Sequence, residues 1–493
     1  MAPSPIALYC GFVLLFALYG ILLPGGVLWD GIGFLERSRD LTQIDLPHLF
    51  YPLLVRLTSA LQGILDAPVE KLAKLWSVLG AALAFILLWR RGSSLGASTP
   101  LALCAALLVA TSPRIWWESV LVEPSTLTLA ALLVAAEIGR ALGPRTLFGR
   151  ALATSLVCVL PMGFHVLSVL AWPWLFLQTK APENAGATPS SRLRPLMLIL
   201  LVVASAGALF GYSHAFGHGP PLGDRVNQFV ETCKGFLPGA SSAKDLMDGV
   251  AAHAITAWRI LGEGEPGLLT AAGTALIVVG IATPAALAHA VLLAGPYLLM
   301  FLICGKPVVG LLLPVYIALH DSVASGTAFA ERSRWTRRIA AAVLPVLVLA
   351  QSSVSLGQAV MHCMSPDLRK QQALAIANAA PEGSVLAAGE LALHLRFYTD
   401  AEVIVLPEVM LYERGRSGPD FNVRAALDAA VQGHLRKGMR VFATPDGVQH
   451  LAKEWNLPPG EWLIGKEPEI VISESPPLKL VELTLPQASQ TSR

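Results

Sequence analysis

Charged residues are scarce in this chain of 493 residues. Asp, Glu, Lys and Arg together make up 14% of it, against about 25% in an ordinary soluble domain. Hydrophobic residues make up 54%, and the mean hydropathy is +0.58. We therefore expect most of the chain to lie in lipid. The net charge of +2 and the lack of a basic cluster argue against a nucleic-acid partner.

Cysteine and the common cofactor motifs are also sparse. The six cysteines are scattered, and none forms a CxxC pair or a Cys/His spacing suited to a metal. The C-terminal part has neither a GxGxxG turn nor a P-loop. No metal site and no cofactor are predicted on these grounds, and dependence on a divalent ion is left open.

The sequence is instead rich in long apolar runs. A helix that crosses a hydrocarbon core of about 30 Å needs about 20 apolar residues, and the chain offers about eleven such runs. They lie at 6–24, 70–89, 99–113, 124–139, 149–163, 164–178, 195–213, 267–283, 285–304, 307–322 and 338–356. The first run lacks a basic flank and a small-residue cleavage site, so it is interpreted as an uncleaved transmembrane helix.

Basic residues give this layout a direction. Arg90 and Arg91 end the second run, and Arg140, Lys180 and Arg332 follow the fourth, sixth and tenth, which puts them all on one side. That side is expected to be the cytoplasm, with the N-terminus on it. The first loop 25–69, the loop 214–266 and the tail 357–493 then face outward. The amphipathic stretch 47–65 is predicted to lie in the membrane interface, because a further span there would reverse every later orientation.

The tail differs in composition from the rest. Strand-like runs at 384–388, 402–406, 440–443, 469–472 and 478–483 alternate with helical patterns at 390–398, 422–437 and 447–455. The predicted fold class is therefore a polytopic α-helical membrane protein (domain 1–356) with a C-terminal extracytoplasmic α/β domain (357–493). The inner or plasma membrane is the expected location.

Three acidic residues are candidates for chemistry near the outer ends of spans. Asp30 directly follows the first span, where apolar surroundings raise the pKa of a carboxylate and suit it to act as a general base. The alternative is that Asp30 only caps the following helix. Glu123 precedes Pro124 at the head of a helix and close to lipid depth, where an ionisable group is a functional candidate. Glu118 is interpreted as a solvated loop charge.

Two basic side chains are further candidates. His165 lies in apolar sequence, where it either packs as a structural residue or binds an anionic headgroup. Lys306 lies at the outer end of two runs, where it either holds a phosphate or reaches to the interface with its charge in water.

The arrangement resembles the GT-C class of membrane glycosyltransferases, in particular the branch related to protein O-mannosyltransferases. Asp30, followed by His48 and the Tyr51-Pro52 pair, is similar to the first-loop pattern of that branch. Two departures stand beside this match. Gly31 follows Asp30 where a second acidic residue is expected, which leaves Glu36 as the alternative second carboxylate, and the prolines after the histidine are replaced.

Two further matches lie in the later hairpins. Trp116 and Glu123 match a tryptophan followed by a glutamate in the third-to-fourth hairpin, and His165 and Pro173 match a His-to-Pro spacing in the next one. The motifs cover roughly the first 180 residues, and the remainder is similar only in architecture.

The resemblance implies inverting transfer of a sugar from a polyprenyl-phosphate donor to a hydroxyl of a protein or glycan at the extracytoplasmic face. Asp30, with Glu36, is the implied catalytic group. The implied substrate and phosphate ligands are His48, Tyr51, Arg56, Glu123, His165 and Lys306. Two alternatives stay open: a transporter or flippase of lipid-linked sugars, and a non-catalytic membrane scaffold.

Overall fold

The structure is a computed structural model of the chain. It describes residues 3–24, 27, 29–39, 48, 50–141, 157–178, 243–262, 266–282, 284–303, 312–364, 367–407, 409, 423–447, 470–474 and 477–483. Contacts divide the chain into two compact units. The first comprises Met1–Pro24 and Arg37–Ser365, and the second comprises Gly25–Glu36 and Pro366–Arg493. The second unit thus includes the start of the first loop.

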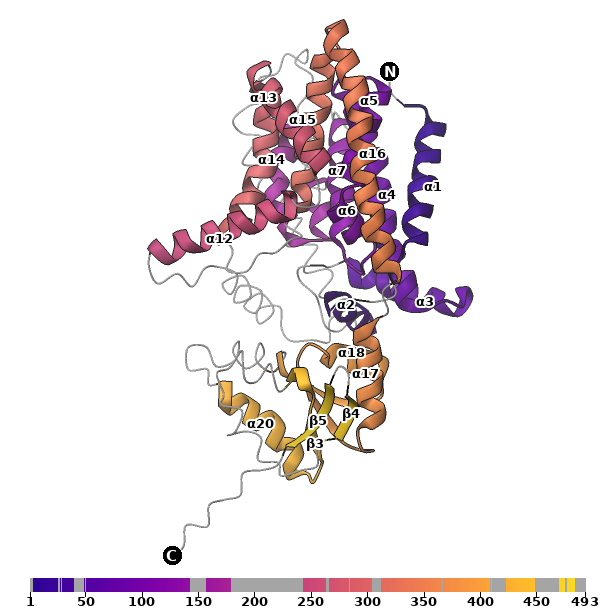
Figure 1. Cartoon of the computed structure of the whole chain (residues 1–493), viewed down its shortest axis with the longest axis vertical. Helices are drawn as coiled ribbons and strands as arrows, with labels where there is room; N and C mark the ends of the chain where they lie inside the picture. Colours follow the sequence, from indigo (N-terminus) through magenta and orange to yellow (C-terminus); the bar gives the residue numbers. More distant parts are fainter. Residues whose placement is uncertain are drawn as a thin grey trace, which may run out of the picture. The chain divides into compact units, whose positions relative to one another are not determined.

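The described elements of secondary structure in the first unit are all helices (Figure 1). Its described helices are α1 (Pro5–Ile21), α3 (Tyr51–Leu65), α4 (Val69–Ser94), α5 (Thr99–Ala110), α6 (Pro113–Ser119), α7 (Ser125–Ala141), the 3₁₀ helix η2 (Val166–Ala171), α9 (Trp172–Gln178), α12 (Ala243–Gly262), α13 (Pro266–Ala282), α14 (Pro284–Ile303), α15 (Leu313–Ala330) and α16 (Arg334–Met364). Helix α2 (Trp29–Arg39) begins in the second unit and ends in the first.

Close approach of α4 to α7 is central to this bundle, and Figure 1 shows the two helices side by side. Gly80 makes it possible, because a Cβ there would lie 2.6 Å from the backbone nitrogen of Leu127. Small residues that let backbones approach are a common device of helix packing in membranes. The pairing fixes the ends of both helices relative to each other.

One end of the first unit gathers several helix termini. The hydroxyl of Tyr19, near the end of α1, donates to the carbonyl of Ala110, the last residue of α5. The hydroxyl of Ser355, toward the end of α16, donates to the carbonyl of Thr111. Helix α7 begins a few residues further on, so we call this the α7 end of the bundle.

Two helices among the described residues are long and apolar enough to cross a membrane: α4 and the helix that starts at Arg334. Helices α5 and α6 together pass the same test as one span bent by 66°. Most of the other predicted runs are also helical where they are described, but the count of eleven spans stays a prediction. The run at 195–213 lies outside the described residues. The stretch predicted to lie in the interface contains α3, and its depth in the membrane stays a prediction.

Arg91 corrects the sequence interpretation. It was counted as a loop cation after the second span, but α4 continues to Ser94 and buries it at 2% exposure. Its Nε and Nη2 donate to the carboxylate of Asp321 in α15 at 2.7 and 2.6 Å. The guanidinium also lies over the ring of Trp174 at 5.0 Å. Burial is tolerated because the opposite charge and the ring replace water around the guanidinium.

The second unit contains a five-stranded sheet of order β2-β1-β3-β5-β4. Its strands are β1 (Val385–Ala388), β2 (Glu402–Val405), β3 (Val441–Ala443), β4 (Ile470–Glu474) and β5 (Pro477–Leu483). Strands β1, β2 and β3 are parallel, and β5 runs antiparallel to β3 and β4. The described helices α17 (Leu368–Ala379), α18 (Ala392–Tyr398) and α20 (Val423–Arg436) complete the unit. All five predicted strands are present, whereas most of the helix predicted at 447–455 lies outside the described residues.

Candidate functional site

The first loop meets the turn before η2. The rings of His48 and His165 are in perpendicular contact, with centroids 4.8 Å apart. The backbone N–H of Phe50 donates to the carbonyl of Gly163 at 2.7 Å, and the Phe50 ring meets the edge of Phe164. Gly163 leaves room for this contact, because a Cβ there would lie 2.0 Å from the Phe50 ring. Two histidines that the resemblance assigns to one site are therefore neighbours.

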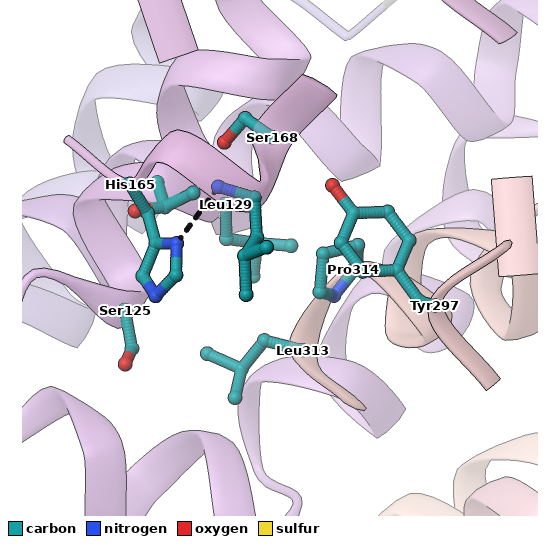
Figure 2. Close-up of a pocket in the computed structure, with 9 residues that line it drawn as sticks. Ser125, Leu129, His165, Ser168, Tyr297, Leu313 and Pro314 are labelled. Carbon is teal, nitrogen blue, oxygen red and sulfur yellow. Dashed lines mark hydrogen bonds between the residues drawn. The ribbon is translucent and has the colours of Figure 1, made fainter. Parts of the chain in front are cut away.

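The ring of His165 is fixed by its own backbone. His165 is the N-cap of η2, and its Nδ1 accepts a hydrogen bond from the N–H of Leu167 at 3.1 Å (dashed in Figure 2). A ring nitrogen that accepts is unprotonated, so the proton of the neutral imidazole is on Nε2.

A small cavity of about 20 Å³ lies beside His165. Figure 2 shows side chains from α7, η2, α14 and the start of α15 around it. Its described lining residues are Ser125, Thr128, Leu129, His165, Leu167, Ser168, Tyr297, Leu313 and Pro314. None of these residues is acidic or a Lys or Arg. The pocket therefore combines hydroxyls and one imidazole with an apolar wall.

Tyr297 stands out among these residues. It is 2% exposed, and its hydroxyl has no hydrogen-bond partner among the described residues. Figure 2 shows the hydroxyl directed across the pocket toward the helix that carries Ser168. A buried hydroxyl without a partner costs about 1–3 kcal/mol, so this side chain is suited to meet a ligand.

Tyr51, Ser77 and Glu123 form a second cluster at the α7 end. The hydroxyl of Ser77 donates to the carbonyl of Glu123 at 2.6 Å and accepts from its N–H at 3.3 Å, which fixes the chain just before α7. Burial raises the pKa of Tyr51 well above its usual value, and the nearby Glu123 carboxylate raises it further, against an opposing effect of the Ser77 hydroxyl. Tyr51 is therefore protonated at neutral pH and can act as a hydrogen-bond donor rather than as a base.

Cations lie near the ends of the first loop. Arg56 is exposed on α3, and its Nη1 donates to the carbonyl of Ser38 at 3.1 Å. Lys74 on α4 is completely buried, and its Nζ donates to the carbonyl of Pro24 at 2.7 Å. Lys306 lies outside the described residues.

Helix α6 buries a charge that the sequence interpretation placed in solvent. Glu118 is 4% exposed and pairs with Arg114 one turn earlier, so it is not a solvated loop residue. The reason is that the loop is itself helical and packs on α4. On the same helix, Trp116 and Trp117 contact the ring of His362 at the end of α16.

The two carboxylates implied as catalytic lie in the second unit. Asp30 is the second residue of α2, so it is inside the helix rather than the cap residue before it, although its side chain is outside the description. Glu36 accepts hydrogen bonds from Nε and Nη2 of Arg396 in α18 at 2.7 and 2.5 Å. That pair occupies both carboxylate oxygens of Glu36. Among the described residues no group of three or more His, Cys, Asp or Glu side chains could hold a metal ion.

No protein-family model and no curated protein matches the chain. Among solved structures it is similar to ArnT from Cupriavidus metallidurans bound to undecaprenyl phosphate, with 13% identity, 97% of this chain and 98% of that chain covered, and a TM-score of 0.55. The same enzyme in the apo state gives 13% identity, coverage of 96% and 98%, and a TM-score of 0.50. ArnT is a GT-C glycosyltransferase and an integral membrane protein. The chain has the GT-C fold.

Within the GT-C fold of this chain, sequence reasoning missed Lys74 and Tyr297. Lys74 falls inside a run interpreted as a plain span, and a lysine within such a run was the signal that could have singled it out. Tyr297 gave no signal, because a tyrosine in an apolar helix is unremarkable until its neighbours are known. Helix α14 brings Tyr297 to a pocket that is otherwise lined by two groups of residues. One group lies more than a hundred residues earlier in the chain, and the other is at the start of α15.

Proposed function

We propose that the protein is a GT-C glycosyltransferase that moves a sugar from a polyprenyl-phosphate donor to an acceptor hydroxyl at the extracytoplasmic face of the membrane. The proposal includes an inverting reaction, a cytoplasmic N-terminus and an extracytoplasmic C-terminal unit. The acceptor is a protein or glycan. The relation to the O-mannosyltransferase branch rests on the sequence motifs around Asp30, Glu123 and His165.

The observation that carries the proposal is the contact of His48 with His165 beside the cavity at the start of α7. It joins two motifs, more than a hundred residues apart, that the resemblance assigns to the donor site. The fold supports the same function, because the similar ArnT structure is bound to undecaprenyl phosphate over a match of nearly the whole chain. A polyprenyl phosphate would extend its tail into lipid and leave its phosphate at the α7 end.

In this proposal each group has a distinct role. Asp30 takes the proton from the acceptor hydroxyl as the hydroxyl oxygen attacks the anomeric carbon. The bond from that carbon to the phosphate oxygen breaks, and the polyprenyl phosphate leaves with an added negative charge. Arg56, His165 and Lys306 donate to this phosphate, and buried Lys74 adds a positive charge at the same end of the bundle. Tyr51 and Glu123 shape the wall between α3 and α7.

Binding of undecaprenyl phosphate to the purified protein in detergent tests the donor side. Native mass spectrometry should show a stoichiometric complex that is weakened at least about tenfold in His165→Ala, since a charge-assisted hydrogen bond is worth about 1.5–3 kcal/mol. His362→Ala is the matched control, because His362 is exposed and contacts only the α6 tryptophans in the described structure. Equal binding by both variants would contradict the assignment of His165.

The same material distinguishes transfer from transport. Membranes with and without the protein should differ in covalently glycosylated protein or glycan by mass spectrometry. Movement of a lipid-linked sugar across vesicles without any covalent product would favour the flippase alternative instead.

A further inference from the structure

We propose that the corner between α15 and α16, residues 331–339, binds the anionic headgroups of phospholipids at the membrane surface. Figure 1 shows this corner at one end of the bundle. Ser355, which contacts the α7 end, lies about 30 Å further along α16. The proposal therefore goes beyond the proposed function, because it concerns a lipid partner at a different place on the protein.

Positive charge is concentrated at this corner. Its arginines are Arg332, Arg334, Arg337 and Arg338, and all four are exposed. The carboxylate of Glu331, their immediate neighbour, is engaged elsewhere, because it accepts a hydrogen bond from the backbone N–H of Ser98 at 2.8 Å. The guanidinium of Arg332 lies over the ring of Phe329 at 5.0–5.5 Å, at a centroid distance of 5.2 Å. The corner therefore presents a cluster of guanidinium groups to its surroundings.

Three of these arginines are in the first five residues of α16, where a positive charge is unfavourable. The N–H groups at the start of a helix give it a positive end, which repels cations and attracts anions. The first turn of α16 contains no acidic residue that would compensate for this charge. A bound anion would reduce both the repulsion from the helix end and the repulsion among the arginines.

Exposed apolar side chains adjoin the arginines on the same helix. Trp335 is 74% exposed, and Ile339, one turn later, is 55% exposed. The exposed stripe continues through Val343 and Val346, along a helix that is long and apolar enough to cross a membrane. Tryptophan is enriched where a span meets the membrane–water interface. The arginines around Trp335 are therefore placed to lie at the depth of the lipid headgroups.

An anionic phospholipid matches both parts of this surface. Its phosphate accepts hydrogen bonds from guanidinium groups, and its glycerol and upper acyl chains pack on Trp335 and Ile339. A soluble anion would pair with the arginines but would leave the apolar side chains in water. Clusters of four or more basic residues beside a span are typical of sites for anionic lipids.

Native mass spectrometry of the full-length protein in detergent tests the charged part, with phosphatidylglycerol and phosphatidylcholine added in equal amounts. The unaltered protein should prefer phosphatidylglycerol. Arg334→Gln with Arg338→Gln should reduce that preference at least about tenfold, since each basic residue near an anionic surface contributes about fivefold to binding. Arg436→Gln with Lys437→Gln is the matched control, because it removes two exposed cations from the second unit and should leave the preference unchanged.

Trp335→Ser tests the apolar part. It should weaken binding of both lipids by a similar factor, because the apolar contact does not depend on the headgroup charge. Inorganic phosphate at the same concentration should not displace phosphatidylglycerol. If the double arginine variant is not obtained folded, Arg332→Gln, which lies before the helix, should show the loss of preference at about fivefold.

Three results would overturn the proposal. The first is a lipid preference that the arginine variants leave unchanged, and the second is an equal loss in the variant of the second unit. The third is displacement of the lipid by inorganic phosphate, which would make the corner a site for a soluble anion. None of these results bears on donor binding near His165, so the proposed function is tested separately.

Discussion

The carboxylate of Glu36 on α2 receives both Nε and Nη2 of Arg396 on α18, at 2.7 and 2.5 Å. A second contact lies on the same segment, where Nε2 of the completely buried His394 donates to the carbonyl of Val27 at 3.1 Å. Both contacts are internal to the second unit. The C-terminal part of the chain therefore holds the segment that carries Asp30.

Arg396→Ala should loosen this segment. Loss of the pair should speed amide exchange of residues 27–36 roughly fivefold, equivalent to about 1 kcal/mol for a half-exposed ion pair. The measurement is hydrogen–deuterium exchange on the full-length protein in detergent. The charge-reversed pair Glu36→Arg with Arg396→Glu should restore most of the protection.

Arg440→Ala is the control for that experiment. Arg440 pairs with Glu482 in the same two-bond geometry at 2.7 Å, and this hydrogen bonding lowers the pKa of Glu482. Its removal should leave exchange at 27–36 unchanged. An equal effect of both variants would show that the unit loosens as a whole rather than at α2.

The second unit should lose stability in mild acid because of His394. Burial lowers its pKa below the usual 6.5, and Arg369 lowers it too, against opposing effects of the Val27 carbonyl, Asp367 and the Glu390 backbone. The unfolded state then binds more protons, so the stabilisation present above about pH 6.5 is lost as the pH falls below it.

His394→Gln separates this effect from general acid sensitivity. A glutamine amide can still donate to Val27 but does not titrate, so protection of 27–36 should become independent of pH between about 5 and 7. His434→Gln changes a half-buried histidine of the same unit and should keep the acid sensitivity. Identical pH profiles in all three proteins would rule out His394 as the group responsible.

Gly80→Ala should destabilise the first unit. The added Cβ would lie 2.6–2.9 Å from backbone atoms of Thr126 and Leu127, which cannot turn away as a side chain can. Such overpacking costs about 1–3 kcal/mol, measured as a lower Tm in detergent. Gly273→Ala on α13, where nothing lies within 4 Å, should leave Tm nearly unchanged. If Gly80→Ala had the same Tm as the unaltered protein, the close approach of α4 to α7 would be contradicted.

Removal of one partner of the Arg91–Asp321 pair should be severe. Asp321→Leu leaves a buried guanidinium without its anion, at a cost of about 3–5 kcal/mol. The double variant Arg91→Met with Asp321→Leu should be more stable than either single variant, because an apolar pair needs no desolvation. The stability of each variant is measured by the amount of folded protein extracted from membranes and by its Tm. If the double variant lost the sum of the two single-variant losses, the direct pairing of Arg91 with Asp321 would be contradicted.

The local sequence pattern was sufficient to predict much of the fold. Alternation of apolar runs with turn signals located the strands that begin at Val385, Glu402 and Val441 to within about one residue. The same holds for α3, whose apolar residues recur at helical spacing. His48 and His165 could be assigned to one site only through resemblance, and their contact is a tertiary fact.

Long-range pairing was beyond the sequence. Arg91 and Asp321 are 230 positions apart, and nothing in either neighbourhood indicates the other. Arg91 followed an apolar run and therefore resembled a loop cation, because a charge pattern cannot show which charges will be neutralised by burial. Likewise, α2 belongs to the C-terminal unit through Glu36 and Arg396, a relation that no period or motif encodes.

Turnover of an undecaprenyl-phosphate sugar by the purified protein in liposomes tests the central claim most directly. The protein should release undecaprenyl phosphate and glycosylate an added acceptor, and Asp30→Asn should abolish both while leaving Tm and donor binding unchanged. Asp66→Asn is the matched control, because Asp66 is an exposed, left-handed residue at the end of α3 that asparagine readily replaces. Unchanged turnover in Asp30→Asn would contradict the assignment of the base, and no turnover in any variant would contradict the proposed transfer.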